Sequence, residues 1–400
     1  MTVGSELTEG LRVDTNTAEV ARDLQRYGFR VAEAVSIADD VASLAVALAR
    51  LTAQHALVVV TGGLGPTHDD ITRDAAAKAL GIGLHPDASL TRFLQPFLAR
   101  HADSGAAPQV LSQALVLDGA AILSPTTGTA AGQVVPTEAG VLVLLPGPPR
   151  EMRPMLALWL SRLVPVRAAA MDLGVTGWPE SDVQLAAQRG LVGHTEIGLT
   201  VLARPGDVRV LLLDEGAGAT GLAAARDSVA LEIGTACYSV TGETLAETVV
   251  RLSTAAHLTL ATAESCTGGM VSSAITDVEG SSAVLLGGVV AYANSAKTSL
   301  LSVPDALLAR HGAVSEQTAL AMAEGARARF GADIAVSTTG VAGPGGGTAD
   351  KPVGLVWLAV ATSSRTSAYE MRMSSADRYA VRSRATARAL DLIRREALGL

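Results

Sequence analysis

A serine that follows an apolar segment is the clearest candidate nucleophile in this sequence. The run Leu258–Ala263 has the short, continuous apolar character of a buried strand, and it leads through Glu264 to Gly269 into a predicted helix at Met270–Ile275. Ser265 is therefore expected at a strand-to-helix elbow, where its hydroxyl can be exposed and neighbouring backbone N–H groups can bind a developing oxyanion. The flanking residues do not match the G-x-S-x-G elbow of α/β-hydrolases.

A lysine further along the chain could be the base that such a serine needs. No histidine lies close to Ser265 on its C-terminal side, whereas the predicted strand Gly287–Tyr292 is followed by Lys297. If the two strands are neighbours, Tyr292 and Lys297 emerge at the same sheet edge as Ser265. A partly desolvated lysine has a lowered pKa and can accept the serine proton. Taken singly, Ser265 also fits a helix cap, Lys297 a solvated helix position and Tyr292 a core aromatic.

A glycine-rich segment follows a third predicted strand of the same region. The strand Ile334–Thr338 runs into Thr339 to Gly347, which contains five glycines. This segment could cradle a phosphate or lie against a flat ligand, or it could be a flexible hairpin. Arg382, in a closing helix predicted from about Ala376 to Arg395, is a further candidate ligand of a nucleotide phosphate.

The first third of the chain offers a second set of loops. The predicted strand Ala56–Thr61 leads into Gly62 to Thr72, and glycines at such a turn let backbone N–H groups approach an anion at the start of a helix. Asp69 and Asp70 would repel a bare phosphate, so the loop is interpreted as a phosphate site that includes a divalent metal. The alternative is a tight turn with an Asp helix cap. Pro146 to Pro149 directly follows a second apolar run, Gly140–Leu145, which is also a predicted strand. This places the prolines at the carboxyl end of that strand, where open α/β sheets bind ligands.

Strand and helix patterns alternate in the first and last thirds of the chain, which favours parallel βαβ units. The region from about Arg167 to Val240 differs, because Gly198–Ala203 and Val208–Leu213 predict a hairpin flanked by helices. The expected fold class is α/β, with two three-layer α/β/α domains at residues 1–166 and 241–400 and a small α+β domain at 167–240. Gly216 to Gly221 matches G-x-G-x-x-G, but its strand is expected to be one arm of the hairpin, which argues against a dinucleotide site.

Charge and composition exclude several classes of protein. The 31 Lys and Arg residues against 39 Asp and Glu give a net charge of −8, opposite to the basic surface that binds nucleic acid or anionic membranes. The longest nearly apolar stretch, Ala283 to Ala293, is shorter than the ~18–20 residues that span a bilayer. Two cysteines cannot form a disulfide framework, the seven histidines show no metal-ligand spacing, and no leader pattern is present. We therefore expect a soluble, cytoplasmic protein.

These motifs together resemble the competence/damage-inducible protein A (CinA) family. In the N-terminal region the resemblance covers roughly residues 2 to 165 and rests on Val3 to Leu7, Asp14 to Asn16, Thr61 to Thr72, Pro125 to Ala130 and Pro146 to Met152. In the C-terminal region it runs from about Thr244 to Ile393 and rests on Glu264 to Gly269, Tyr292 to Lys297, Gly340 to Gly347, Lys351 to Gly354, Asp377-Arg378 and Val381-Arg382. The first region is similar to molybdopterin-binding domains and the second to nicotinamide-nucleotide amidases. One departure is the short segment before Gly4, which shortens the expected first strand.

The resemblance implies two activities. The C-terminal domain would hydrolyse the carboxamide of nicotinamide mononucleotide, giving nicotinate mononucleotide and ammonia, without a cofactor and with Ser265 as nucleophile activated by Lys297 and Tyr292. The residues expected to bind this substrate are Glu264, Thr267, Gly268, Gly269, Asn294, Thr339, Gly340, Gly343, Gly345 and Arg382. The N-terminal domain would cleave the pyrophosphate of ADP-ribose-like nucleotides with a divalent metal such as Mg, Co or Mn. Its nucleotide-binding residues would be Glu6, Asn16, Gly62, Gly63, Gly65, Thr67, Gly128, Thr129, Pro146 and Gly147, and its metal ligands Asp39, Asp69 and Asp70.

Two other interpretations stay open at the level of sequence. In one, only the amidase is active and the N-terminal domain binds a pterin-like or nucleotide ligand. In the other, the chain is a non-enzymatic regulatory protein of DNA uptake or the damage response, against which the acidic balance and the Ser-Tyr-Lys set count. The expected partners are small nucleotides, without nucleic acid or membrane, and the resemblance makes a homodimer the expected assembly.

Overall fold

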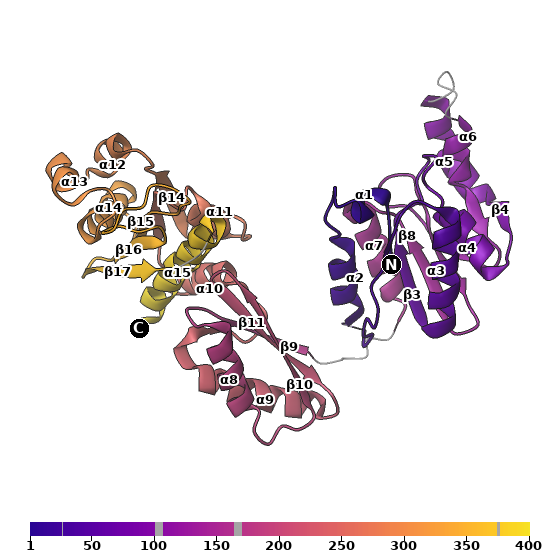
Figure 1. The fold of residues 1–400 in the computed structure, drawn as a ribbon, viewed down its shortest axis with the longest axis horizontal. Helices are drawn as coiled ribbons and strands as arrows, with labels where there is room; N and C mark the ends of the chain where they lie inside the picture. Colours follow the sequence, from indigo (N-terminus) through magenta and orange to yellow (C-terminus); the bar gives the residue numbers. More distant parts are fainter. Residues whose placement is uncertain (26, 101–106, 164–169, 374–376) are drawn as a thin grey trace. The chain divides into compact units, whose positions relative to one another are not determined.

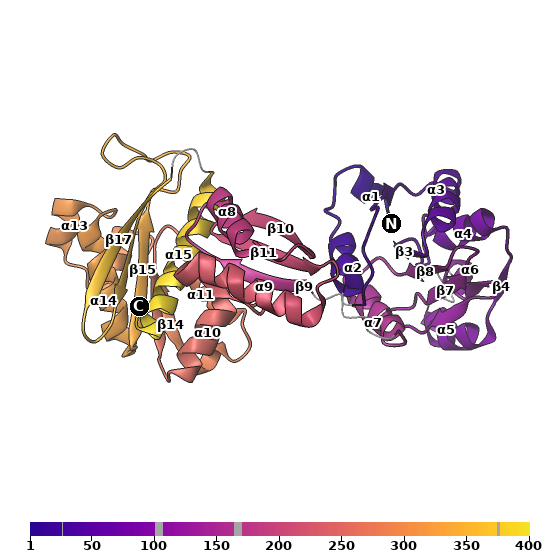
Figure 2. The same cartoon turned by 90° about the horizontal axis from the view of Figure 1, so that it is seen from below.

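The computed structural model describes residues 1–400 except 26, 101–106, 164–169 and 374–376 (Figures 1 and 2). Its internal contacts divide the chain into two compact units, Met1–Ala168 and Ala169–Leu400. The second unit contains two separate sheets, one within residues 170–239 and one within residues 260–372. The expected domain boundary at 166/167 and the expected start of the closing helix at Ala376 lie outside the described residues. The chain is an α/β protein, as its sequence predicts.

The N-terminal unit is built on a mixed sheet with the strand order β2-β1-β3-β8-β7-β6. Its strands are β1 (Thr2–Val3), β2 (Ser36–Ile37), β3 (Leu57–Thr61), β6 (Ala121–Leu123), β7 (Gly132–Pro136) and β8 (Val141–Leu145). The first four in this order are parallel, whereas β7 and β6 are antiparallel additions that the sequence did not predict. The short β1 lies inside the sheet, where the amino group of Met1 donates a hydrogen bond to the carbonyl of Val59 at 2.8 Å.

Helices cover both faces of this sheet, which gives the unit three layers (Figure 1). The remaining elements are α1 (Ser5–Thr8), α2 (Asn16–Gln25), α3 (Val41–Gln54), α4 (Thr72–Leu80), β4 (Leu84–Pro86), α5 (Ala88–Arg100), α6 (Ala107–Ser112), β5 (Leu115–Leu117) and α7 (Pro149–Leu160). Val58 and Val60 pack with α3 and α4 on one face, while Val59 packs with α2 and α7 on the other. The strand is buried on both sides, which explains its uninterrupted apolar sequence.

The middle domain is a four-stranded antiparallel sheet with two helices packed on it. Its elements are β9 (Ala170–Val175), α8 (Glu180–Gly190), β10 (Ile197–Arg204), β11 (Asp207–Asp214), α9 (Gly218–Ile233), the 3-10 helix η1 (Gly234–Ala236) and β12 (Cys237–Ser239), with the strand order β10-β11-β9-β12. β10 and β11 form the predicted hairpin. The G-x-G-x-x-G segment leads into α9, but β11 has antiparallel neighbours on both sides, so this is not a dinucleotide-binding βαβ unit.

The C-terminal domain is a mixed five-stranded sheet with the strand order β14-β13-β15-β16-β17. Its elements are α10 (Leu245–Ala255), β13 (Leu260–Glu264), α11 (Met270–Thr276), the 3-10 helix η2 (Ser281–Ala283), β14 (Leu285–Val290), α12 (Asn294–Leu301), α13 (Asp305–His311), α14 (Glu316–Phe330), β15 (Ile334–Gly340), β16 (Leu355–Ala361), β17 (Thr366–Arg372) and α15 (Arg378–Leu398). α10, α11 and α15 pack on one face and α12 to α14 on the other. β14, β13 and β15 are parallel, so their carboxyl ends meet at one edge, where open α/β sheets bind ligands.

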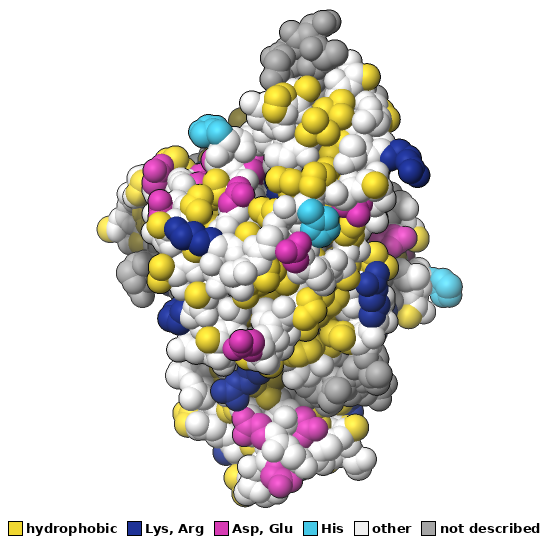
Figure 3. All heavy atoms as spheres, turned by 90° about the vertical axis from the view of Figure 1, so that its right-hand side faces the viewer, with side chains coloured by type: hydrophobic (Ala, Val, Ile, Leu, Met, Phe, Trp, Pro, Cys, Tyr) yellow, Lys and Arg dark blue, Asp and Glu magenta, His cyan; other side chains and the backbone are white. Residues whose placement is uncertain are grey.

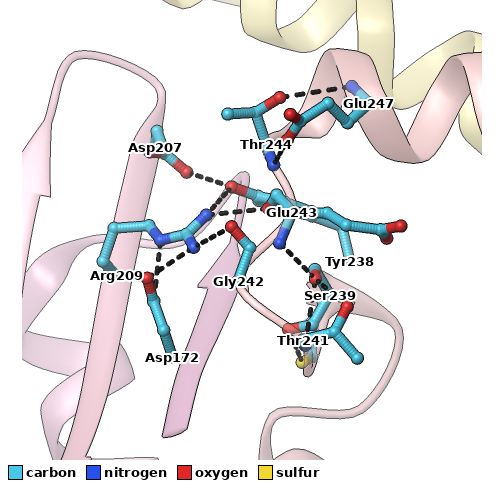
Figure 4. Close-up of polar contacts among 11 residues, drawn as sticks. Asp172, Asp207, Arg209, Tyr238, Ser239, Thr241, Gly242, Glu243, Thr244 and Glu247 are labelled. Atoms are coloured by element: carbon cyan, nitrogen blue, oxygen red, sulfur yellow. Dashed lines mark hydrogen bonds and ion pairs between the residues drawn. The ribbon is translucent and has the colours of Figure 1, made fainter. Parts of the chain in front are cut away.

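A largely buried arginine ties the middle domain to the segment that enters the C-terminal domain (Figure 4). Arg209 of β11 donates hydrogen bonds of 2.8–2.9 Å to Asp172, to the hydroxyl of Tyr238 and to the backbone carbonyls of Gly242 and Glu243. A capping box then closes the first turn of α10. The two domains of the second unit are therefore joined by a hydrogen-bonded connection.

Charged side chains are dispersed on the face of the molecule drawn in Figure 3. Lys and Arg side chains lie singly there, among acidic and hydrophobic ones. The described part of this face therefore offers no extended basic patch of the kind that nucleic acids bind. Within the described ranges, none of the helices is long and apolar enough to cross a membrane.

Candidate functional site

Two parallel neighbouring strands bring Ser265 and Lys297 together. β13 pairs with β14, and Glu264 lies opposite Val290 at the carboxyl ends of the two strands. Ser265 follows β13 directly, and Lys297 lies in the first turn of α12, shortly after β14. The Lys297 Nζ is 3.0 Å from the Ser265 Oγ. The two side chains that the sequence suggests as candidate nucleophile and candidate base are thus hydrogen-bonded to each other.

Lys297 is almost completely removed from water, with 1% of its surface exposed. Its Nζ also donates to two backbone carbonyls, those of Ala291 at 2.7 Å and Tyr292 at 3.2 Å. Within the described residues no carboxylate forms an ion pair with this amine. Burial lowers the pKa of Lys297, because the charged form loses its hydration, and the smaller opposing influence of Cys266 does not reverse this direction. The amine is therefore easier to deprotonate than that of an exposed lysine.

The elbow that carries Ser265 is held from beneath by a buried carboxylate. Both oxygens of Glu264, which is fully buried, accept hydrogen bonds of 2.7–3.0 Å from the Thr267 hydroxyl, from the backbone N–H groups of Gly269, Val271 and Ser272, and from the Ser272 hydroxyl. These donors include backbone N–H groups of the first turn of α11, which otherwise lack partners in the helix. Glu264 and Thr267, which we expected to bind substrate, instead bind each other and fix the elbow.

Arg382 of α15 holds the outer side of the same elbow. Its Nε and Nη2 donate to the carbonyls of Cys266 at 3.2 Å and Thr267 at 2.8 Å. Gly268 and Gly269 adopt φ values of +61° and +96°, a left-handed backbone that glycine tolerates far better than other residues. The guanidinium that we expected on a substrate phosphate is therefore bound to the elbow backbone.

The backbone N–H groups of the elbow differ in whether they have partners. Ser265 donates its own N–H to the carbonyl of Thr338 at 2.9 Å, and Gly269 donates to Glu264. In the described structure, the N–H groups of Cys266 and Thr267 donate to no oxygen atom. Both interact with the Cys266 thiol, and they are the candidate donors to an oxyanion next to the Ser265 hydroxyl.

Tyr292 does not take the position expected of an activating residue. Its side chain is 63% exposed and its hydroxyl accepts a hydrogen bond from Arg378 at 3.2 Å. No hydrogen bond joins that hydroxyl to Ser265 or Lys297 among the described residues, and Tyr292 acts on Lys297 only through its backbone carbonyl. Asn294, at the first position of α12, is exposed. The phenol stands at the outer rim of the site because the strand has ended before it.

Arg378 belongs to this site, whereas the sequence analysis named it only as part of the Asp377-Arg378 motif and gave it no role. Besides Tyr292 it reaches the carbonyl of Gly343 at 2.8 Å, so it joins the end of β14 to the glycine-rich segment. The sequence signal that could have found it is the start of α15, where Asp377 caps the helix by accepting the N–H of Ala380. The pattern locates the helix start, but the two groups that the guanidinium meets come from remote parts of the chain.

The glycine-rich segment divides between sheet and loop. The Thr339 hydroxyl is buried and donates to the carbonyl of Ala313 at 2.6 Å, and Gly340 is still part of β15. Gly343 lies in the loop against Arg378, and Gly345 has open space around its Cα. Only the second half of the segment is therefore free to meet a ligand.

Cys266 stands next to the candidate nucleophile and is buried. Burial raises the pKa of its thiol to about 11. A thiol with so high a pKa is almost entirely protonated at neutral pH and is a poor nucleophile. Cys266 is therefore a weaker candidate nucleophile than Ser265.

In the N-terminal unit, a cavity of about 390 Å³ lies at the carboxyl ends of β3 and β8. Of the residues predicted for this site, those lining the cavity are Glu6, Asn16, Asp39, Gly62, Gly63, Gly65, Asp69, Asp70, Gly128, Thr129, Pro146 and Gly147. Thr67 does not line it. Arg12, Asp14, Gln113 and Glu151 also line the cavity and were not among the predicted site residues, although Asp14 and Glu151 lie in motifs of the family resemblance. Arg12 and Gln113 lie outside every motif named from the sequence, so no local pattern marked them.

Hydrogen bonds fix the glycine loop of this cavity. Asp70 accepts the N–H groups of Gly65 at 2.7 Å and Thr67 at 2.8 Å, together with the Thr67 hydroxyl. The buried Arg73 donates to the carbonyls of Leu64 and Gly65 at 2.8 and 3.2 Å. Asn16 bridges this loop region to the next one, since its amide donates to the carbonyl of Gly147 at 2.7 Å.

The three predicted metal ligands do not form a ligand cluster in this arrangement. Both oxygens of Asp70 are bound to its own loop, and one oxygen of Asp39 accepts the N–H of Ser5 at 2.7 Å. Among the described residues, no group of three or more His, Cys, Asp or Glu side chains could hold a metal ion. The residues as placed do not fit a bound metal, and a metal at this cavity stays a prediction.

Comparisons with known proteins match both ends of the chain. Residues 1–165 match the family model described as "Probable molybdopterin binding domain", and residues 242–397 match the model of the CinA C-terminal domain. These matches define an α/β protein that joins a molybdopterin-binding type of domain to a CinA type of domain.

Relatives match over almost the whole length. The CinA-like protein of Thermotoga maritima is 36% identical over 100% of this chain and 98% of its own, and that of Akkermansia muciniphila is 38% identical over 97% and 94%. A solved structure, the competence/damage inducible protein CihA from Agrobacterium tumefaciens, is 42% identical and covers 40% of this chain and 98% of its own, with a TM-score of 0.37. The chain belongs to the CinA family.

The burial of Glu264 predicts that the elbow depends on its charge. Glu264→Gln replaces one acceptor oxygen with an amide that faces N–H donors, so we expect the C-terminal domain to lose about 2–4 kcal/mol of unfolding free energy. Urea unfolding measures the effect. Glu279→Gln is the matched control, since this exposed side chain has no partner among the described residues, and it should change stability by less than about 0.5 kcal/mol. Equal stability of the two variants would contradict the assigned role.

Proposed function

We propose that the C-terminal domain is a serine amidase that hydrolyses nicotinamide mononucleotide to nicotinate mononucleotide and ammonia. The observation that carries the proposal is the 3.0 Å hydrogen bond between Ser265 Oγ and the buried amine of Lys297. A hydroxyl paired with an amine of lowered pKa is the arrangement of Ser-Lys hydrolases. The resemblance of the motifs to nicotinamide-nucleotide amidases supports the choice of substrate.

The geometry around Lys297 supports its role as the base. A neutral amine has two hydrogens and one lone pair. The carbonyls of Ala291 and Tyr292 accept hydrogen bonds from Nζ, so they can take both hydrogens. The lone pair is then left for the hydroxyl proton of Ser265. In this state Ser265 Oγ is the donor and Lys297 the acceptor, which is the direction that proton transfer needs.

The reaction proceeds in two balanced steps. Ser265 Oγ attacks the carboxamide carbon while Lys297 takes its proton, and the resulting oxyanion is stabilised by the N–H groups of Cys266 and Thr267. The C–N bond then breaks and Lys297 gives its proton to the departing amine, which leaves as ammonia. Water attacks the acyl-enzyme ester with Lys297 again as base, releasing the carboxylate and restoring Ser265.

Ser265→Ala and Lys297→Met should each lower kcat for ammonia release by at least about 10³-fold, because each removes a group that acts in the transition state. The assay is ammonia release from nicotinamide mononucleotide by the purified full-length chain in EDTA. Ser295→Ala is the matched control, since this exposed serine of α12 makes no side-chain hydrogen bond among the described residues. Near-native turnover by Ser265→Ala would contradict the mechanism.

The pH dependence follows from the lowered pKa of Lys297. Only the neutral amine can accept the serine proton, so kcat/KM should rise with pH and level off above the Lys297 pKa. The midpoint of this rise should lie below the usual lysine value near 10.5. A pH–rate profile of the wild type measures it. A profile without an acid limb would argue against Lys297 as the base.

We further propose that the N-terminal cavity binds a nucleotide of the ADP-ribose type. Its volume of about 390 Å³ lies within the range of small-molecule sites, and its walls include the glycine loop after β3. Pyrophosphate cleavage there is what the family resemblance predicts. The chain's own residues would fix the loop through Asp70 and Arg73 and join it to the neighbouring loop through Asn16.

Asp70→Ala should abolish hydrolysis of ADP-ribose assayed with added divalent metal, because it frees the N–H groups that hold the loop and removes a cavity carboxylate. Ammonia release by the C-terminal domain should stay unchanged. Asp74→Ala, an exposed position of α4, is the control. Unchanged ADP-ribose hydrolysis in Asp70→Ala would contradict a role for this loop, whereas loss of both activities would indicate misfolding.

A further inference from the structure

A cavity of about 790 Å³ lies between the middle domain and the C-terminal domain and shares no lining residue with either site described above. One wall is the segment 176–180 before α8 together with the turn of the β10–β11 hairpin, and the other is β17 and α15. The walls touch at Gly206, where a side chain would come within 2.6 Å of the Ala387 Cβ. The cavity is thus part of one packed unit, and neither Ser265 nor Lys297 lines it.

The lining of this cavity is basic, although the whole chain carries a net charge of −8. Its charged residues are Arg204, Arg372, Arg384, Arg388 and Arg395 against Glu180, Asp207 and Glu370. Two of the three acids are already engaged. Asp207 accepts a hydrogen bond from the Tyr238 hydroxyl at 2.6 Å, and Glu370 is paired with Arg372. Five arginines against three acids leave an excess of two positive charges.

Two of these five arginines, one on each wall, have no side-chain partner among the described residues. Arg388 and Arg395 share Asp391, at 2.8 and 2.9 Å. By contrast, Arg204 on the hairpin and Arg384 on α15 make no side-chain hydrogen bond or ion pair in the described part of the chain. A guanidinium binds phosphate oxygens with two parallel N–H bonds, so two unpartnered arginines around one cavity suit a phosphate group.

An exposed tryptophan completes the lining. Trp178 precedes α8, lines the cavity and is 37% exposed. Aromatic residues make up 3% of this chain, and Trp159, in the N-terminal unit, is buried. An indole face next to arginines is a surface on which an aromatic base stacks favourably.

We propose that this cavity binds a nucleoside phosphate, with the phosphate on Arg204 and Arg384 and the base against Trp178. The volume lies within the ~300–1,000 Å³ of small-molecule sites. The site is independent of the proposed amidase function, because it shares no residue with the Ser265 elbow. Its ligand would bridge the middle-domain hairpin and α15.

Tryptophan emission of the full-length chain titrated with AMP tests the proposal. We expect saturable quenching of Trp178 in the wild type and its loss in Trp178→Phe. The double variant Arg204→Ala/Arg384→Ala should bind AMP more than about tenfold more weakly, since it loses the charged hydrogen bonds from both guanidinium groups to the phosphate. Arg189→Ala is the matched control, because this arginine of the middle domain pairs with Glu232 and does not line the cavity.

Three results would overturn the proposal. One is quenching by AMP that persists in Trp178→Phe, or an affinity for AMP that is unchanged in the double arginine variant. Another is binding of inorganic phosphate, measured by competition with AMP, that is as tight as binding of AMP, since the base would then contribute nothing. The third is a change in the molar mass of the double variant by light scattering, which would assign the arginines to a contact between copies of the chain.

Discussion

The buried amine of Lys297 is the interaction on which the C-terminal site depends. An ammonium group removed from water loses a large hydration free energy, and here neutral oxygens alone surround it. The charged form is therefore disfavoured relative to the neutral one. Such a group keeps its position only if the structure fixes its acceptors. The two carbonyls come from the chain just after β14, and Ser265 comes from the end of β13, so the parallel pairing of these strands sets all three.

The two strand-to-helix loops of the chain are stabilised in the same way, although they lie in different domains. In the C-terminal elbow Glu264 accepts backbone N–H groups and Arg382 donates to carbonyls. In the N-terminal loop Asp70 and Arg73 do the same. In each loop a carboxylate thus binds backbone N–H groups and a guanidinium binds backbone carbonyls. These charged residues therefore position the loops, although motif analysis readily assigns such residues to ligand binding.

The sequence predicted the parts of the structure that depend on local pattern. The strands that carry both sites were found from apolar runs, and the proximity of Ser265 to Lys297 followed from the rule that parallel strands end at one edge. The directions of side chains were harder to foresee. Arg382 and Tyr292 were expected to act on substrate or nucleophile, but Arg382 turns to the elbow carbonyls and Tyr292 to Arg378. Those partners lie about a hundred residues away along the chain, so no local sequence pattern indicates these contacts.

The long stretch of chain between the elbow and α15 has a consequence for synthesis on the ribosome. Arg382 lies 116 residues after Cys266, whose carbonyl it binds, and α15 packs on the sheet that carries Ser265. β13, β14 and Lys297 can leave the ribosomal tunnel well before α15 does. In the nascent domain the elbow therefore lacks its contact with Arg382 until α15 has emerged and packed on the sheet.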